Sequence, residues 1–350
     1  MLFKASFRLA VMGVLALSGC SNEPEEAPLR EGVYVVGSST VFPFAKAVAD
    51  ATRAANPELA DITIESTGTA EGITQFCAGV GHASPDIVNA SRRMTPAEFS
   101  RCAGNGVTEI VELRIGIDGI VFVSSLDGGL SLDLTKAQIY RALAAEPYGE
   151  EQTAQKWSDV GSGLPEEDIY VYGPPDTSGT RASLVELVMQ DGCEAGARLG
   201  NLQASDPQRY NDVCASLRTD GAYQDQGEND DAIVRRVANN PVALAIVGYS
   251  WFEENQDLVQ AMRINGVAPA ADTIASGSYP ASRPLFIYVK KAHLELIDGL
   301  APYIAQWAAS WGEGGPLEAI GLVISSPADR DAAAATARDM TVLTQEALGG

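Results

Sequence analysis

Short apolar runs alternate with amphipathic stretches along most of the chain. Runs with the length and β-branched content of buried strands lie at 32–37, 61–65, 86–90, 117–124, 169–172, 243–249 and 285–289. Segments with apolar residues at helical spacing alternate with them, at 42–55, 73–78, 181–189, 230–239 and 294–311. Because strands and helices alternate in this way, we predict an α/β fold with mostly parallel sheets. Residues 32–350 are more than a single core comfortably holds, so we expect two lobes.

The N-terminal segment follows a different pattern. Two basic side chains precede an apolar run at 9–17, which is too short to span a membrane and has the length of a secretory signal. The sequence Leu-Ser-Gly-Cys at 17–20 resembles a bacterial lipobox, in which the cysteine becomes the first mature residue and carries a lipid. An ordinary signal peptide with an incidental cysteine is the alternative. We expect a signal peptide over 1–19, a lipid anchor at Cys20 and a flexible tether over 20–31.

The charge of the chain narrows the classes of partner. Its 24 Lys and Arg residues against 46 Asp and Glu give a net charge of −22 at neutral pH. Proteins that bind nucleic acids or anionic lipid surfaces need a basic surface, so both classes are excluded. A small anion is not excluded, because salt screens surface charge over about 8–10 Å and oriented N–H groups set their own local potential.

Export makes the cysteines candidates for disulfides, because an oxidising compartment allows them to form. With Cys20 assigned to the lipid, four cysteines are left, and four allow three pairings. The simplest pairing is local in the chain, Cys77 with Cys102 and Cys193 with Cys214, and four reduced thiols are the alternative. The sequence has no Cys-x-x-Cys motif and no His at ligand spacing from a Cys, so no metal site is expected.

Three turns between a strand and a helix share one design. They are GSSTVFP at 37–43, STGTAEG at 66–72 and GPPDTSGTR at 173–181. Each combines small residues and hydroxyl side chains with the start of a helix, where backbone N–H groups lack partners and attract anions. One such turn is usually only a helix cap, but three of them in one exported chain predict an anion site.

Motifs of the common enzyme classes are missing. The sequence contains no GxxxxGK[ST], GxSxG or HExxH motif. The two imidazoles, His82 and His293, lie in hydrophilic segments, and we expect both at the surface. We therefore expect neither catalysis nor a cofactor. The alternative is an exported phosphoryl- or acyl-transfer hydrolase with Ser178 or Ser39 as nucleophile, which would need a base beside the serine.

Four motifs in order along the chain resemble a known family. They are Gly-Ser-Ser-Thr-Val-Phe-Pro at 37–43, Asn-Ala-Ser-Arg-Arg at 89–93, Asp-Thr-Ser-Gly-Thr at 176–180 and the segment from Asn240-Pro241 to Gly248-Tyr249. Together they resemble the periplasmic phosphate-binding proteins of phosphate ABC transporters, over residues 33–325. The resemblance implies a two-lobed Venus-flytrap fold of type II with a two-strand hinge. It also implies a protein of the periplasm or cell envelope that closes its cleft around inorganic phosphate and delivers it to an inner-membrane ABC permease; we expect a monomer.

The resemblance also implies which residues bind the anion. They are Ser39, Thr40 and Val41 in the first turn, Thr69 in the second, and Ser178, Gly179 and Thr180 in the third. The chain departs from the family where Arg92 replaces an Asp that accepts the phosphate proton, and where Pro174 and Pro175 replace an Arg. We expect Arg92 to hold the anion with both arms of its guanidinium, with Arg181 as a second candidate and Arg93 in a structural role.

The missing Asp leaves selectivity open. A site made only of hydrogen-bond donors does not prefer a protonated oxyanion, because rejecting sulfate needs a buried acceptor that would face a lone pair. Sulfate, molybdate and phosphonate therefore stay possible ligands. A sensory or scaffolding lipoprotein with the same fold is a further alternative.

The resemblance and the strand pattern together suggest how the lobes divide the chain. We expect lobe 1 to comprise 32–118 and 284–350, and lobe 2 to comprise 119–283. The two crossovers, near 117–120 and 283–286, would form the hinge about which a ligand closes the lobes.

Overall fold

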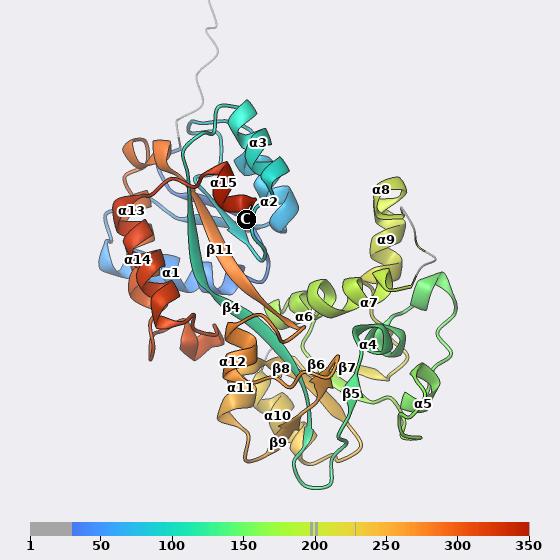
Figure 1. The fold of residues 1–350 in the computed structure, drawn as a ribbon. Coiled ribbons are helices and arrows are strands. Elements are labelled where there is room, and N and C mark those ends of the chain that lie inside the picture. Colours follow the sequence, from blue (N-terminus) through green and yellow to red (C-terminus); the bar gives the residue numbers. More distant parts are fainter. Residues whose placement is uncertain (1–29, 197–198, 200–201, 228, 350) are drawn as a thin grey trace, which may run out of the picture.

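The computed structural model describes residues 30–196, 199, 202–227 and 229–349. The expected signal peptide, Cys20 and the tether up to residue 29 lie outside the described residues. In Figure 1 the described chain forms two α/β bodies joined by two long strands. No helix within these ranges is long and apolar enough to cross a membrane.

Lobe 1 is a sheet with helices on both faces. Its strand order is β2–β1–β3–β11–β4, in which β1 is parallel to β2 and β3, and β11 is antiparallel to β3 and β4. The strands are β1 (Tyr34–Gly37), β2 (Thr63–Ser66), β3 (Ile87–Ala90), β4 (Ile110–Ser125) and β11 (Ser282–Lys290). One core contains side chains of α1 (Phe42–Ala55), α13 (Leu300–Ser310) and α14 (Pro327–Asp339). The other core contains side chains of α2 (Thr69–Phe76) and α3 (Pro96–Gly104), with α15 (Gln345–Leu348) packed against it.

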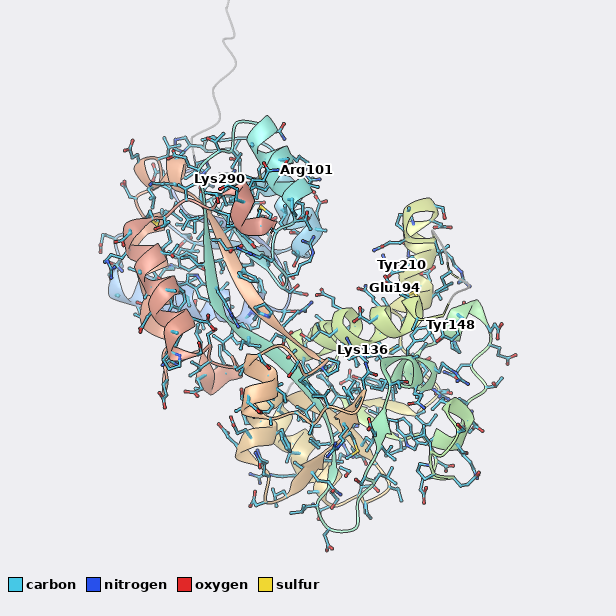
Figure 2. The ribbon with its side chains drawn as sticks, in the orientation of Figure 1. Arg101, Lys136, Tyr148, Glu194, Tyr210 and Lys290 are labelled. Atoms are coloured by element: carbon cyan, nitrogen blue, oxygen red, sulfur yellow. A yellow bond between two sulfur atoms is a disulfide. The ribbon has the colours of Figure 1, made fainter. Side chains whose placement is uncertain are left out.

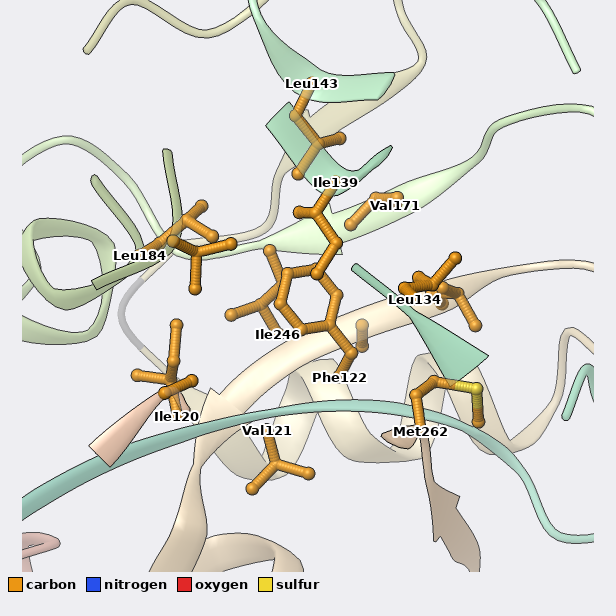
Figure 3. Close-up of a cluster of buried hydrophobic side chains, with 14 of the residues drawn as sticks. Ile120, Val121, Phe122, Leu134, Ile139, Leu143, Val171, Leu184, Ile246 and Met262 are labelled. Atoms are coloured by element: carbon orange, nitrogen blue, oxygen red, sulfur yellow. The ribbon is translucent and has the colours of Figure 1, made fainter. Parts of the chain in front are cut away.

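Lobe 2 is built on the second half of β4. Its strand order is β4–β8–β6–β7, with β8 antiparallel to β4, β6 parallel to β8 and β7, and β9 paired with β4. The strands are β6 (Val171–Gly173), β7 (Tyr223–Asp225), β8 (Leu244–Gly248) and β9 (Val259–Ala261), beside the short pair β5 (Asp133–Leu134) and β10 (Arg263–Ile264). Figure 3 shows the core, in which Phe122 of β4, Ile246 of β8 and Val171 of β6 gather with side chains of the surrounding helices.

The helices of lobe 2 surround this sheet. They are α4 (Lys136–Leu143), α5 (Trp157–Val160), α6 (Gly179–Leu184), α7 (Gln190–Glu194), α8 (Leu202–Ser205), α9 (Pro207–Cys214), α10 (Asp230–Ala238), α11 (Tyr249–Glu254) and α12 (Ala271–Ala275). A π-helical turn, η2 (Val185–Met189), joins α6 to α7. Short 3-10 turns lie at η1 (Pro147–Gly149) in this lobe and at η3 (Lys291–Glu295) and η4 (Glu318–Ile320) in lobe 1.

The strand β4 belongs to both lobes. Its first part pairs with β11, from Ile110 opposite Lys290 to Gly119 opposite Ser282, and its last part pairs with β8 and β9. The buried apolar side chains divide at the same place, because one core lies within 117–281 and the other two draw on residues before 116 and after 284. We expect the lobes to move as separate bodies with boundaries at residues 118 and 284, and this stays a prediction.

The predicted alternation of strands and helices is confirmed, with differences at the ends of elements. The strand expected at 117–124 already begins at Ile110. The charged side chains of Glu112 and Arg114 interrupt the apolar pattern of its first half, so the sequence did not predict that half as a strand. Each of these side chains is half-buried and forms an ion pair on the sheet. The helix expected over 181–189 runs on to Glu194 and widens into the π-helical turn on the way.

Both chain-local disulfides are confirmed. Cys77, directly after α2, is bonded to Cys102 in α3, and their Cα atoms lie 4.3 Å apart. Cys193 in α7 is bonded to Cys214 at the end of α9, with a Cα separation of 5.4 Å. Each bond therefore joins two neighbouring helical segments of one lobe.

A polar cluster is buried at the end of lobe 1 that is remote from lobe 2, where Figure 2 labels Lys290. Its core is Asp86, which accepts from both arms of the Arg30 guanidinium at 2.8 and 2.9 Å and lies 2.6 Å from Nδ1 of His293. The Gly81 amide donates to Nε2 of the same ring. The expectation that His293 lies at the surface is wrong, because both ring nitrogens have buried partners and the side chain is 0% exposed.

The ammonium group of Lys290 lies in the same cluster. Its Nζ donates to the Gly79 carbonyl at 2.6 Å and to the Ser84 hydroxyl at 2.9 Å, and it lies 4.8 Å from the centre of the Phe76 ring. His82, on the loop between these partners, is only half-buried, and its Nδ1 lies 2.8 Å from the Arg30 carbonyl. Lys290 and its neighbours thus bind the loop over residues 79–84 to the interior of lobe 1.

Removing one disulfide is expected to destabilise lobe 2. The Cys193→Ser/Cys214→Ser variant frees a loop closed over a separation of 21 residues, so the unfolding free energy should fall by roughly 3 kcal/mol. Urea denaturation followed by circular dichroism measures this loss. Cys77→Ser/Cys102→Ser is the matched comparison, because its separation of 25 residues predicts a similar effect. Unchanged stability in both variants would contradict the structural role of the bonds.

Stability is expected to depend on the protonation of Lys290. Burial lowers the pKa of Lys290 from 10.5 to about 7, opposed by the nearby Asp86 charge and reinforced by Arg30. Between these pH values the unfolded chain binds more protons at this residue than the folded chain, so its contribution to the unfolding free energy rises with pH from about 7 to 10.5. Denaturation curves across this range should show that rise in the wild type and a flatter profile in Lys290→Met. Equal slopes in the two proteins would refute the assignment.

Candidate functional site

The three turns that the sequence singled out lie at the carboxyl ends of strands. Because β1, β2 and β3 are parallel, Gly37, Ser66 and Ala90 end at the same edge of the lobe 1 sheet. The third turn follows Gly173 at the end of β6 in lobe 2. Ligands of open α/β sheets bind at such edges, so this topology gathers the candidate groups where a ligand is expected.

The first turn is fixed by its backbone. The Gly37 carbonyl accepts the Thr67 and Gly68 amides at 2.9 Å, and Ser38 donates to the Asn89 carbonyl at 2.9 Å. Gly37 has φ +124°, and a Cβ there would lie 2.2 Å from the Asn89 carbonyl oxygen, so only glycine fits. The helix α1 then begins without a side-chain cap. Of the predicted ligands in this turn, Ser39 is half-buried, and Thr40 and Val41 are buried.

The third turn lies against the first. Ser178 caps α6, since its hydroxyl oxygen accepts the Thr180 amide at 3.2 Å. The position that a Cβ of Gly179 would occupy is 3.7 Å from the Thr40 carbonyl oxygen. Ser183, one turn further along α6, lies 3.5 Å from the Thr40 hydroxyl. The structure therefore brings the first and third turns into direct contact.

The second turn reaches the same region through β3. The Thr69 hydroxyl lies 2.9 Å from the Ser91 hydroxyl and accepts the Ser91 amide at 3.1 Å. Ser91 then donates its hydroxyl to Oε2 of Glu186, in η2 of lobe 2, at 3.0 Å. Thr69 is thus linked to the other lobe through one intervening serine.

Arg283 lies at the centre of these groups, and the sequence did not single it out as a ligand. Its Nη2 donates to the Thr40 hydroxyl at 3.2 Å, and its Nη1 binds Oε2 of Glu186 at 2.5 Å. Its Nε lies 3.4 Å from Asp118, its pairing partner across β4 and β11. One signal in the sequence could have identified this pair. An acidic residue lies in one predicted crossover, and a basic residue lies in the other. We call Thr40, Thr69, Ser91, Asp118, Ser183, Glu186 and Arg283 the Arg283 network.

Asp118 is the most deeply held carboxyl group of the network. Burial raises its pKa, and the charge of Arg283 and a 2.5 Å hydrogen bond from the Ser183 hydroxyl oppose that rise. The side chains of Asp118 and Arg283 are each only 13% exposed. An arginine and a buried carboxyl therefore meet where the lobes join.

The other predicted arginines have different partners. Both arms of the Arg92 guanidinium bind Glu98, at 2.9 and 2.7 Å, and this hydrogen bonding raises the pKa of Arg92. Arg181 lies over the Tyr223 ring, 4.6 Å from its centre. The structural role expected of Arg93 is confirmed, because it binds Glu112 at 2.7 Å and also the Ala347 carbonyl. The use of Arg92 and Arg181 as ligands stays a prediction, and the charge of Glu186 adds to the rise in the pKa of Arg92.

Comparison with known proteins identifies the relatives of this chain. A family model described as a PBP superfamily domain matches residues 22–310. Protein SphX of Synechococcus elongatus is 28% identical over 292 residues, which cover 81% of this chain and 76% of that protein. Phosphate-binding protein PstS of Staphylococcus saprophyticus is 27% identical over 266 residues, 74% of this chain and 70% of the relative. A crystal structure of a possible phosphate binding protein from Planctomyces limnophilus aligns with a TM-score of 0.68 at 27% identity, over 89% of this chain and 99% of that one.

The predicted fold class is confirmed on these grounds. The family match covers well over half of the chain, and the sheet order and the two shared strands are those described above. The chain belongs to the PBP superfamily and has the two-lobed, type II fold of periplasmic binding proteins.

Proposed function

We propose that this protein binds inorganic phosphate outside the cytoplasm and delivers it to an ABC permease. The observation that carries the proposal is that the Arg283 guanidinium donates to the Thr40 hydroxyl, while Ser91 of lobe 1 and Ser183 of lobe 2 donate to the two carboxyl groups beside it. Guanidinium and hydroxyl donors suit a tetrahedral oxyanion. The names of the relatives PstS and of the Planctomyces structure point to phosphate in particular.

The proposed site combines the predicted turns with Arg283. Ser39, Thr40, Val41, Thr69, Ser178, Gly179 and Thr180 keep the roles that the sequence suggested. Arg283 is proposed in the place that the sequence gave to Arg92, because Arg283 contacts Thr40 of the first turn, whereas both arms of the Arg92 guanidinium bind Glu98.

Asp118 is proposed as the buried acceptor that distinguishes phosphate from sulfate. It lies beside Arg283 and is shielded from water. A hydrogen-bearing phosphate can donate to such a carboxylate, whereas a sulfate oxygen would meet it with a lone pair and be repelled. Asp118 would thus take the role of the proton-accepting Asp that the family has at the position of Arg92.

The lobes are proposed to move about the crossing strands. Arg283 and Asp118 face each other where β11 and β4 pass between the lobes, so a ligand on Arg283 acts on the hinge itself. The bound anion would favour the closed arrangement by contacting both lobes, and the permease would recognise that arrangement. We also propose a monomer that is anchored through a lipid on Cys20.

The hydrolase alternative has no support in the site. The Ser178 oxygen accepts a backbone N–H, and no imidazole of the described residues lies beside Ser178 or Ser39. His293 is bound to Asp86 at the opposite end of β11 from Arg283. The relatives are named for binding phosphate rather than for a reaction.

Calorimetric titration of the purified protein with phosphate, sulfate and molybdate tests the ligand. We expect phosphate to bind far more tightly than the other two. Affinity weaker than about 1 mM for every oxyanion would contradict the proposed function.

Three arginine variants test the assignment of the guanidinium. Arg283→Lys keeps the charge but loses the fork, so phosphate affinity should fall on the order of 100-fold. Arg92→Lys should bind nearly as the wild type does, and Arg93→Lys is the control because its guanidinium is bound to Glu112 and the Ala347 carbonyl. If Arg92→Lys lost binding while Arg283→Lys kept it, the sequence-based assignment would be right and ours wrong.

A further inference from the structure

We propose that Glu186 is an internal competitor of the bound oxyanion and so sets which anions the site accepts. The inference rests on the proposed function, since it concerns the same guanidinium. It assigns a specificity role to a residue that lies outside all of the motifs in the sequence.

The contacts of Glu186 are those of an oxyanion oxygen. Its Oε2 receives the Ser91 hydroxyl at 3.0 Å and the Arg283 guanidinium at 2.5 Å. One donor follows the end of β3 and the other lies in β11, and each is a kind of group that binds phosphate oxygens in proteins. One carboxylate oxygen of the chain itself therefore occupies the donors that a ligand would use.

The backbone around Glu186 is unusual in the way that functional sites often are. Glu186 lies in the π-helical turn η2, between the α-helical segments α6 and α7. Such turns are rare and occur frequently at functional sites. Ser183, three residues earlier and on the same face, holds Asp118. One helix face therefore supplies both Glu186 itself and the partner of Asp118, the other carboxyl neighbour of Arg283.

The two carboxyl groups that flank Arg283 differ in how far their side chains are exposed to water. The Glu186 side chain is 32% exposed, whereas Asp118 is 13% exposed and held by Ser183. Glu186 is the group that can turn toward water without burying a charge elsewhere. An arriving anion would therefore displace Glu186 and leave Asp118 in place.

A competing side chain of this kind admits only those anions that bind the site more strongly than it does. A side chain attached to the site acts at an effective concentration of millimolar order, which dissolved monoanions must exceed before they bind. A monocarboxylate offers Arg283 nothing that Glu186 does not already offer. A tetrahedral dianion brings a second charge and more oxygens, so it can replace Glu186 where acetate or nitrate cannot.

The same contact also joins the lobes. Glu186 belongs to lobe 2 and Ser91 to lobe 1, so their hydrogen bond crosses the junction. An anion that displaces Glu186 must take over this connection. Competition and lobe closure are thus linked through one carboxylate.

The test replaces Glu186 by Gln, which keeps the shape and the acceptor for Ser91 but removes the charge that binds Arg283. Calorimetry with phosphate should show binding tightened by roughly 5- to 100-fold, the range of a typical coupling between two ligands. Acetate and nitrate should compete with phosphate in Glu186→Gln but not in the wild type. Unchanged or weaker phosphate binding, or no new competition, would overturn the proposal.

Asp191→Asn is the matched control. It removes the same charge from α7, on the same continuous helical run, where Asp191 is paired with Lys136 at 2.6 Å. It should change neither phosphate affinity nor the exclusion of acetate. Equal gains in both variants would show a general charge effect and refute a specific role of Glu186.

A second measurement separates this inference from the proposed function. Amide hydrogen exchange at Ser91 and at the start of α6, measured without any added oxyanion, should be faster in Glu186→Ala, because this variant removes the acceptor of the Ser91 hydroxyl and with it the interlobe contact. If no oxyanion bound to the wild type, the proposed function would fail while this result still showed whether Glu186 joins the lobes. Unaltered exchange would contradict the interlobe contact itself.

Discussion

The antiparallel pairing of β4 with β11 is the constraint on which the rest of the structure depends. These two strands carry the chain between the lobes, and their register places Arg283 opposite Asp118. Because backbone hydrogen bonds fix that register, the two side chains cannot drift apart while the strands stay paired. Thr40 in the turn after β1 binds this guanidinium, Ser183 of α6 binds Asp118, and Ser91 after β3 reaches the pair through Glu186. The proposed hinge and the proposed centre of the site are therefore one element.

The proposed site would explain how so acidic a chain can bind an anion. The chain carries a net charge of −22, and even at the junction Arg283 faces the carboxyl groups of Asp118 and Glu186. At this junction one guanidinium faces two carboxyl groups and several hydroxyl groups, so an anion proposed to bind there must match that geometry rather than follow a broad positive field. Local arrangement outweighs composition because the acidic surface is screened by salt within about 10 Å.

The parts that sequence could predict are those encoded by neighbouring residues. Strand and helix alternation, the turn motifs and the chain-local disulfides depend on short spacings, and the structure contains all of them. The remaining features depend on residues that are distant in sequence. His293 is buried because Asp86, more than two hundred residues earlier, lies against it. Arg92 is an exception, because its partner Glu98 lies only six residues further along the chain. Arg283 and Glu186 meet only because β11 passes beside the end of α6, and no local pattern records that meeting.

The buried cluster around Asp86 also determines how the folded chain responds to a mechanical load. Arg30 is the first described residue, and its guanidinium binds Asp86 and the carbonyls of His82 and Ser84. Tension on the preceding segment therefore enters lobe 1 at the end of the sheet opposite to Arg283. The force would spread through paired strands of one lobe and would not act across the crossing strands. If the protein is anchored at its N-terminus as proposed, its lobes could open and close without working against that attachment.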